Sequence, residues 1–351
     1  MPLVSLLGGL GLLIMGAEAL VRGSARLAAA FGVSPLVIGL TVVAFGTSAP
    51  ELAVSVKAAR AGSAGLAVGN VLGSNIFNVL AILGMSAVVT PLMVSRQLLR
   101  LDVPVMIAAS GLAWGLAADG AVGRLDGLLL FAGLLVYTGV LVVRSRRERR
   151  DIVAEYGAAL PGGGGRLPVQ VALIIGGLGL LVVGSGLLVG GASDLARKLG
   201  VSELVIGLTI IAAGTSMPEA VTSLVASLRG QRDLAVGNVV GSNIFNLLAV
   251  LGLSGAVAAD GVPVTAEALR FDFPVMAAVA VACLPVFFTG QVIARWGGGV
   301  FLFYYVAYAA YLVLAATGHA ALEGYGRIMM VFVVPLTVLT LGLLVLRAVR
   351  R

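Results

Sequence analysis

Two glutamates lie in the middle of apolar stretches of the sequence. Glu51 ends the segment GTSAPE, Glu219 ends the near copy GTSMPE, and no other charged residue lies within five positions of either one. A charged side chain at the centre of a bilayer costs roughly 2.5 to 3.5 kcal/mol on insertion scales. Because no Lys or Arg close in sequence can neutralise these carboxylates, we expect a bound cation or a proton to compensate them.

Hydroxyl side chains precede both glutamates at helical spacing. Thr47 and Ser48 lie four and three residues before Glu51, and Thr215 and Ser216 stand at the same distances before the second glutamate. Residues three and four positions apart share one face of a helix. Each segment is therefore predicted to gather two hydroxyls and one carboxylate on one face.

A proline stands directly before each glutamate. Pro50 and Pro218 lack the N–H that would bond the carbonyl oxygen four residues earlier, and the proline ring crowds that carbonyl. We expect both helices to kink here and to leave backbone oxygens free around 44–46 and 212–214. Free backbone groups at membrane depth are tolerated where they line a cavity.

A second repeated motif adds further oxygens. The sequence GNVLGSNIFN contributes Ser74 and Asn78, and its copy GNVVGSNIFN contributes Ser242 and Asn246. With the first motif, this makes two carboxylates, two amides and six hydroxyls, a set that suits calcium and sodium rather than zinc or copper. Two glutamates balance one divalent ion or two competing monovalent ions, which is a physical basis for exchange. The motif's other asparagines fit helix packing through interhelical hydrogen bonds at least as well as direct ion binding, and they are left out of the predicted site: Asn70, Asn75, Asn238 and Asn243.

The composition predicts an all-α polytopic membrane protein. Of the 351 residues, 60% are hydrophobic and 11% are charged, with a mean hydropathy of +1.10, whereas soluble domains carry about a quarter charged residues. About 20 apolar residues cross the hydrocarbon core. This length gives eleven expected spans, near 3–21, 33–56, 67–90, 103–118, 125–143, 168–190, 201–228, 234–257, 273–289, 297–317 and 328–346.

The two halves of the chain repeat each other. Residues 33–51 align with 201–219 and residues 66–84 align with 234–252, both at an offset of 168. Each repeat holds five spans, and an odd number inverts the second copy in the membrane, as in secondary transporters with a midplane site. The predicted divisions are a first five-helix repeat, a cytoplasmic linker, a second five-helix repeat and an extra C-terminal transmembrane helix with a basic tail, over 1–143, 144–167, 168–318 and 319–351.

The basic residues predict the orientation in the membrane. Sixteen of the 23 Lys and Arg residues fall on one side of the expected spans and seven on the other. Cytoplasmic loops carry the excess, so we expect the N-terminus outside the cell inner (plasma) membrane and the linker and C-terminus in the cytoplasm. The linker reads as a short flexible connection, and its glycines do not form a phosphate-binding loop. We expect no nucleotide, nucleic acid or cofactor and no enzymatic activity, and the oligomeric state stays open.

The paired motifs GTSAPE with GNVLGSNIFN and GTSMPE with GNVVGSNIFN resemble the alpha repeats of the sodium/calcium exchanger family, prokaryotic type, within the cation/calcium antiporter superfamily. The resemblance implies two inverted five-helix halves with ion sites between the second, third, seventh and eighth helices. It implies an antiporter that exchanges calcium for sodium, with Glu51 and Glu219 as the main ligands. The remaining ligands that it implies are the hydroxyls of Thr47, Ser48, Ser74, Thr215, Ser216 and Ser242 and the carbonyls of Ala44 and Ala212.

One position departs from part of that family. Some prokaryotic members and the potassium-dependent branch carry an aspartate where this chain has Asn246. The asparagine weakens the case for a potassium site and removes one possible proton carrier. Proton-coupled calcium exchange and a passive cation channel stay open as alternatives. Two further acidic residues, Asp102 and Asp272, begin expected spans and are interpreted as helix N-caps.

Overall fold

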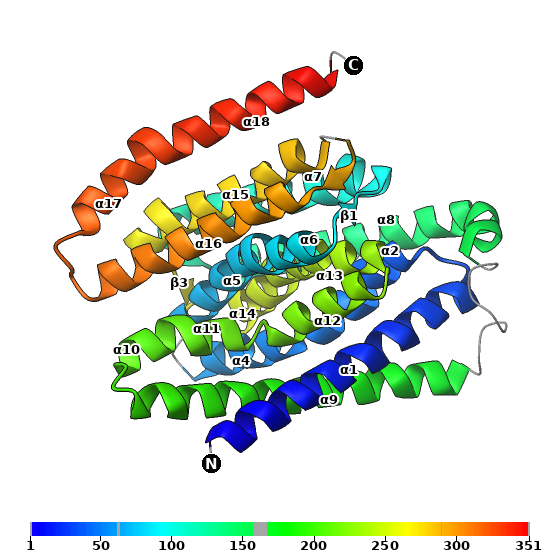
Figure 1. Ribbon diagram of the computed structural model, residues 1–351, viewed down its shortest axis with the longest axis horizontal. Coiled ribbons are helices and arrows are strands. Elements are labelled where there is room, and N and C mark those ends of the chain that lie inside the picture. Colours follow the sequence, from blue (N-terminus) through cyan, green and yellow to red (C-terminus); the bar gives the residue numbers. More distant parts are fainter. Residues whose placement is uncertain (1, 62–63, 157–166, 289, 350–351) are drawn as a thin grey trace.

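The computed structural model describes residues 2–61, 64–156, 167–288 and 290–349, and almost all of them are helical (Figure 1). The first half contains α1 (Pro2–Phe31), α2 (Pro35–Ile38), the π-helical segment η1 (Gly39–Val43), α3 (Ala44–Thr47), α4 (Ala49–Arg60), α5 (Gly65–Phe77), the π-helical η2 (Asn78–Leu83), α6 (Gly84–Val89), the π-helical η3 (Leu98–Asp102), α7 (Val103–Leu116), the 3-10 turn η4 (Ala117–Asp119) and α8 (Arg124–Tyr156).

The second half repeats this order of elements. It contains α9 (Leu167–Lys198), α10 (Glu203–Ile206), the π-helical η5 (Gly207–Ile211), α11 (Ala212–Gly214), α12 (Met217–Leu228), α13 (Arg232–Phe245), the π-helical η6 (Asn246–Leu251), α14 (Gly252–Val257), the π-helical η7 (Ala268–Asp272), α15 (Phe273–Phe288) and α16 (Arg295–Ala316). The C-terminal segment follows as α17 (Leu322–Ile328), the π-helical η8 (Met329–Val333) and α18 (Val334–Val349).

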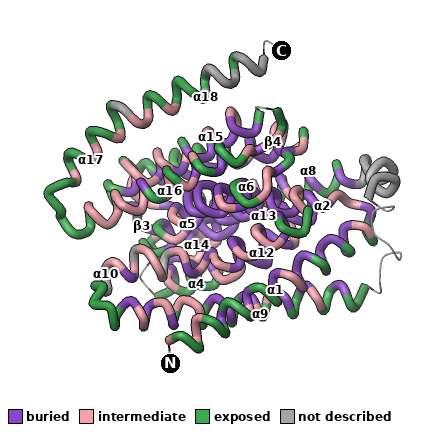
Figure 2. The backbone as a smooth tube through the Cα atoms, viewed as in Figure 1, coloured by how far each residue is buried: buried purple, intermediate pink, exposed green. Residues whose placement is uncertain are grey.

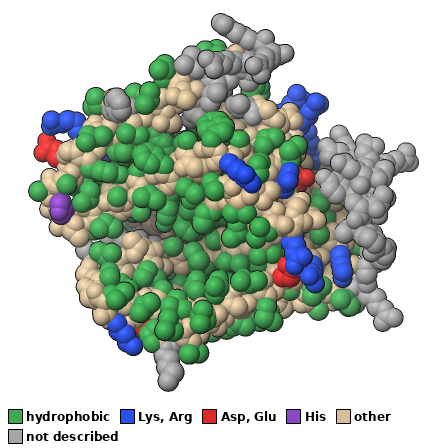
Figure 3. All heavy atoms as spheres, in the orientation of Figure 1, with side chains coloured by type: hydrophobic (Ala, Val, Ile, Leu, Met, Phe, Trp, Pro, Cys, Tyr) green, Lys and Arg blue, Asp and Glu red, His purple; other side chains and the backbone are tan. Residues whose placement is uncertain are grey.

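The helices agree with a multi-pass membrane protein. In the described part of the chain, nine helices are long and apolar enough to cross a membrane, and one further pair, Pro35–Thr47 and Ala49–Arg60, does so as a span bent by 45°. The remaining expected span, 201–228, is divided among α10, η5, α11 and α12. The extra C-terminal helix is present and lies at the edge of the bundle farthest from α1 and α9 (Figure 1). Few charged side chains interrupt the hydrophobic surface of the face in Figure 3.

Equivalent helices of the two repeats pack antiparallel, as inversion requires. In α1 and α9, which lie side by side (Figure 1), the backbone of Gly16 contacts that of Gly177, and the backbone of Gly9 contacts that of Gly184. A Cβ at Gly177 would lie 2.7 Å from the Gly16 oxygen, so the seam between these helices requires glycine. Small residues permit this approach of helix backbones in membranes.

The second pair of equivalent helices forms the centre of the bundle. The segments α5–η2–α6 and α13–η6–α14 are the most enclosed in the molecule, and buried backbone concentrates there in Figure 2. Two short antiparallel ribbons also join the repeats, pairing β1 (Leu92–Met93) with β4 (Val292–Ile293) and β2 (Ala121–Val122) with β3 (Val262–Pro263). These ribbons were not predicted, because two-residue strands leave no periodic pattern in a sequence.

Two further predictions were wrong, one on the linker and one on Asp102. The expected flexible linker does not begin at 144, because α8 continues as a helix through the basic run to Tyr156; residues 157–166 lie outside the described part. Asp102 does not cap a helix with its side chain. Its Oδ1 instead accepts a hydrogen bond from the Tyr137 hydroxyl at 2.9 Å, and Asp272 accepts one from Tyr308 at 3.0 Å. These bonds tie spans together inside each repeat.

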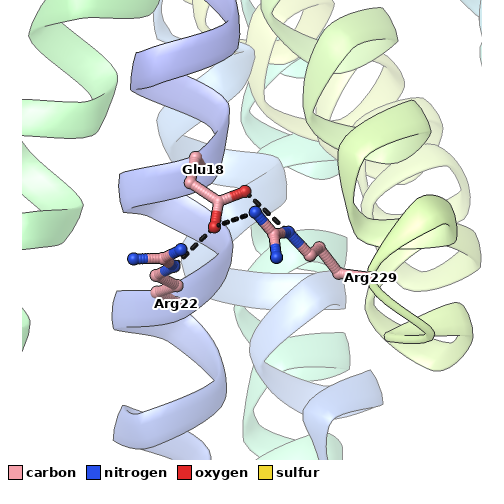
Figure 4. A network of polar contacts seen from close by, with 3 residues as sticks. All are labelled: Glu18, Arg22 and Arg229. Carbon is pink, nitrogen blue, oxygen red and sulfur yellow. Dashed lines mark hydrogen bonds and ion pairs between the residues drawn. The ribbon is translucent and has the colours of Figure 1, made fainter.

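An ionic cluster ties α1 to the end of α12. Both carboxylate oxygens of Glu18 contact the Arg229 guanidinium, at 2.9 and 2.8 Å, and Arg22 contacts the same carboxylate (Figure 4). The equivalent positions of the other repeat, 168 residues away, hold Gly186, Gly190 and Ala61. The cluster therefore belongs to one side of the molecule only.

We expect Arg229→Gln to lower the free energy of unfolding by about 1 kcal/mol at low salt, because it breaks a two-pronged ion pair to a carboxylate whose side chain is only 21% exposed. Thermal unfolding in detergent at low and high salt measures this, and the difference should shrink as salt screens the pair. Arg327→Gln is the control, since its pair with Glu323 is largely exposed. Equal unfolding temperatures for Arg229→Gln and wild type at low salt would contradict the prediction.

Candidate ion-binding site

The first repeat's helix is broken at the motif that ends in Glu51. α3 ends at Thr47 and α4 begins at Ala49, with Ser48 between them at φ −85° and ψ 5°. Pro50 occupies the first turn of α4, where its missing N–H costs least. The expected kink is confirmed, and in the second repeat α11 and α12 separate at the equivalent place, across 215–216.

The backbone oxygens around the break are less free than we expected. The carbonyl of Ala44 accepts the Ser48 N–H at 3.0 Å, so it retains one helical hydrogen bond. Gly46 loses its helical donor because Pro50 has no N–H. In the second repeat the carbonyl of Gly214 accepts the Ser185 hydroxyl at 2.6 Å. Ala212 begins α11, and its side chain lies outside the described part.

Each glutamate accepts a hydrogen bond from a serine of the opposite repeat. The Ser48 hydroxyl donates to Glu219 Oε1 at 2.8 Å, and the Ser216 hydroxyl donates to Glu51 Oε1 at 3.2 Å. Both carboxylates are almost fully buried, with exposures of 1% for Glu51 and 0% for Glu219. The sequence placed each serine with the glutamate of its own motif, whereas the structure pairs it with the other one. The crossed bonds bring both helix breaks to one place.

The other predicted hydroxyls differ in their burial and in their hydrogen-bond partners. Ser74 is buried and its hydroxyl lies 3.1 Å from the Ser216 hydroxyl, which can accept from it while donating to Glu51. Ser242 is fully buried, and its hydroxyl has no partner among the described residues. Thr47 lies 3.1 Å from Asn238 Oδ1 and also bonds the preceding helical turn. Thr215 is half-buried and lies 3.4 Å from an amide oxygen of the other repeat.

Asn78 and Asn246 each stand where an α-helix widens into a π-helical turn. Both residues are fully buried, and each begins the segment, η2 or η6, that follows the second motif. Such π-helical turns occur often at functional sites because they displace carbonyls from the regular ladder. The sequence predicted the amides but not this widening.

Five buried oxygens at this centre have no hydrogen-bond donor among the residues that the structure describes. They belong to the two glutamates, the two asparagines and one serine: Glu51 Oε2, Glu219 Oε2, Asn78 Oδ1, Asn246 Oδ1 and Ser242 Oγ. A buried acceptor without a partner costs free energy comparable to a lost hydrogen bond, and more where it is charged. Carboxylate, amide and hydroxyl oxygens of this kind are the ligands that a hard cation takes.

Two asparagines that were left out of the predicted site support the backbone of the glutamates. Asn70 donates to Ser55 at 2.9 Å and to the backbone carbonyl of Glu51 at 3.4 Å. Asn238 makes the same two contacts in the other repeat, to Ser223 and to the backbone of Glu219. The identical recurrence of these residues in both copies is the signal that could have identified them as supports of the glutamates.

The donor set excludes several kinds of metal centre. Within the described ranges no group of three or more His, Cys, Asp or Glu residues could hold a metal ion. The unpaired atoms are carboxylate, amide and hydroxyl oxygens, which suit calcium or sodium. The arrangement can therefore hold a hard cation, with two carboxylates to balance its charge.

Comparison with known proteins identifies the family of this chain. The family model "Sodium/calcium exchanger protein" matches residues 1–143 and 169–314. The chain is 40% identical to the putative antiporter CaxA of Alkalimonas amylolytica over 87% of its length and 96% of that protein, and 32% identical to the sodium/calcium exchanger MaX1 of Methanosarcina acetivorans over 88% and 97%. It superposes on the solved sodium/calcium exchanger from Methanococcus jannaschii with a TM-score of 0.75 and 31% identity, over 88% of this chain and 97% of that one.

Proposed function

This chain belongs to the sodium/calcium exchanger family, and we propose that it exchanges calcium for sodium by alternating access to a midplane site between its two repeats. The family is one of membrane transporters rather than enzymes, and its substrates are cations. The proposal adds the direction of coupling and the residues that hold the ions. It is supported by the exchangers named above, which cover nearly the whole chain.

The observation that carries the proposal is the crossed pair of glutamates with unpaired oxygens. In Glu51 and in Glu219, one carboxylate oxygen accepts a hydrogen bond from a serine of the opposite repeat. The other carboxylate oxygen has no donor in the described part of the chain. Two carboxylates neutralise one calcium ion or two sodium ions. Because both ions need the same oxygens, occupancy by one excludes the other, and that exclusion couples their movements.

The position of the site between the repeats supports alternating access. Its ligands come from both halves, and the two halves approach from opposite sides of the membrane. A movement of α1 and α9 against the central helices would open the site to one side at a time, as inverted repeats allow. The extents of the family match, 1–143 and 169–314, support the division into two five-helix repeats.

We also propose the orientation in the membrane. The excess of Lys and Arg on one side supports an N-terminus outside the cell and a linker and C-terminus in the cytoplasm. The helical extension of α8 would then project the basic run from the cytoplasmic face. The membrane is taken to be the cell inner (plasma) membrane.

The test is calcium uptake by proteoliposomes that contain the purified chain. An outward sodium gradient at clamped pH should drive uptake, and an equal potassium gradient should not. A proton gradient that drives uptake where sodium does not would establish the proton-coupled alternative. Calcium flux that continues without any counter-ion gradient would establish a channel, and either result would overturn the proposed sodium coupling.

A further inference from the structure

Four asparagines meet where the central helices of the two repeats cross. Asn75 and Asn78 come from α5 and η2, and Asn243 and Asn246 come from α13 and η6. All four are at most 3% exposed. We refer to these four residues as the amide relay, because their side chains form two hydrogen-bonded pairs, Asn78 with Asn243 and Asn246 with Asn75, and each pair joins the two repeats.

The relay begins at backbone carbonyls, which fix the orientation of two amides. Asn75 Nδ2 donates to the backbone oxygen of Asn243 at 3.2 Å, and Asn243 Nδ2 donates to the backbone oxygen of Asn75 at 3.2 Å. A backbone oxygen only accepts, so each side chain must present its NH₂ group to it. The thioethers of Met276 and Met106 lie beside the same NH₂ groups at 3.7 and 3.6 Å and are also acceptors.

The orientation of the first two amides fixes the other two. Because the NH₂ groups of Asn75 and Asn243 are directed at acceptors, their Oδ1 atoms are left to receive hydrogen bonds. Asn78 Nδ2 donates to Asn243 Oδ1 at 3.0 Å, and Asn246 Nδ2 donates to Asn75 Oδ1 at 3.1 Å. The Oδ1 atoms of Asn78 and Asn246 are then the unpaired oxygens noted above.

We propose that Asn75 and Asn243 are positioning residues that make the ion site selective for cations, by holding the Asn78 and Asn246 amides with their oxygens, and not their NH₂ groups, toward the ion. An amide that is free to turn could present a donor to the site and repel a cation. The relay removes that freedom without adding charge. The inference rests on the proposed function only in taking calcium as the bound ion.

The relay also gives a reason for asparagine at 246. An ionised aspartate there could not donate to Asn75 Oδ1, and two oxygens would face each other. Asn75 could turn to donate instead, but it would then direct its own oxygen at the Asn243 carbonyl. Turning either amide of this pair leaves two acceptors in contact, so Asn75 and Asn246 are specified together, and the same holds for Asn78 and Asn243.

The test is a set of double-mutant cycles on calcium binding by the full-length protein in detergent, measured as the dissociation constant for radioactive calcium by equilibrium dialysis. Asn243→Ala should weaken binding about tenfold. In the Asn78→Ala background, Asn243→Ala should change the dissociation constant less than twofold, because the Asn78 amide that Asn243 orients is no longer present. The mirror cycle pairs Asn75→Ala with Asn246→Ala and should behave in the same way.

The control cycle uses two relay residues from different pairs, whose side chains are not joined by a hydrogen bond among the described residues. Asn243→Ala and Asn246→Ala lie on consecutive segments of the same repeat, so their effects should multiply. Each variant is compared as folded protein, with thermal unfolding recorded, and Asn243→Ser replaces the alanine variant if that one is not recovered. Losses that multiply in both crossed cycles, or unchanged binding in Asn243→Ala, would overturn the relay.

The result also separates this inference from the proposed function. Calcium binding with multiplying losses overturns the relay and leaves sodium-coupled exchange standing. A wild-type protein that binds no calcium overturns both. Crossed coupling in the binding data, together with calcium uptake that does not respond to sodium in proteoliposomes, supports the relay and overturns sodium coupling alone.

Discussion

Glu51→Gln and Glu219→Gln should each reduce sodium-driven calcium uptake by a factor on the order of 100 or more. Glutamine can keep the bond that each carboxylate accepts from a serine, Ser216 or Ser48, through its single oxygen. Its NH₂ group then occupies the place of the unpaired Oε2 and directs a donor at the cation. Loss of one of the two buried carboxylates leaves a bound divalent ion with one uncompensated positive charge, which is costly in a dry interior.

Uptake into proteoliposomes with matched protein content measures this effect. The control is Glu323→Gln, which removes a glutamate whose side chain is 87% exposed and should leave uptake unchanged. Thermal unfolding separates loss of ion binding from loss of folded protein. Wild-type uptake by both Glu51→Gln and Glu219→Gln would remove these residues from the site and overturn its assignment.

Gly177→Ala should prevent α1 and α9 from packing and should sharply reduce the amount of folded protein. The added Cβ would lie 2.7 Å from the Gly16 oxygen and 2.8 Å from the Leu20 nitrogen, both backbone atoms that cannot turn aside. Separating two helices that touch along the seam costs more than the single methyl group indicates, and overpacking of this kind typically costs about 1 to 3 kcal/mol.

The neighbouring position provides a matched control. Gly176→Ala adds the same methyl group to the same helix, but no atom lies within 4 Å of the new Cβ. It gains helix propensity and should melt at or above the wild-type temperature. Thermal unfolding and the yield of monodisperse protein in detergent measure the difference. Equal unfolding temperatures for the two variants would contradict close backbone packing at this seam.

Gly16→Ala offers a further check on the same contact. Its Cβ would meet the Gly177 oxygen at 2.7 Å, so the two glycines occupy one meeting point of the helices. Once the methyl group of one alanine has separated the two backbones, the methyl group of the second alanine can be accommodated in the same gap. The double variant should therefore be less destabilised than the sum of the single variants, as expected for residues in contact.

Several features of the fold followed from local sequence. Hydropathy predicted the membrane helices, and the offset of 168 residues predicted two inverted repeats, because an odd number of spans reverses the second copy. The kink before Glu51 followed from Pro50 alone, since a missing N–H acts on its own helix. Each of these inferences depends on residues close together in the chain or on exact recurrence.

Predictions that depended on distant partners fared worse. Asp102 stands at an expected helix start, and its position suggested an N-cap. Its carboxylate instead accepts a hydrogen bond from Tyr137, 35 residues away. The basic run after 143 suggested a flexible linker, yet α8 continues through it to Tyr156. The basic composition of the segment indicates that it is exposed to water. It does not show whether the helix continues beyond the membrane.

By itself, the sequence determined the class of protein, its two inverted halves and a set of oxygen-bearing side chains suited to hard cations. Only the tertiary structure decided which oxygens are free. Ser48 bonds the glutamate 171 residues away rather than the one three residues away, and the hydrogen bonds of the amide relay leave the Asn78 and Asn246 oxygens unpaired in the described part of the chain. A hydrogen bond depends on where helices cross, and that crossing is set by the packing of both repeats together.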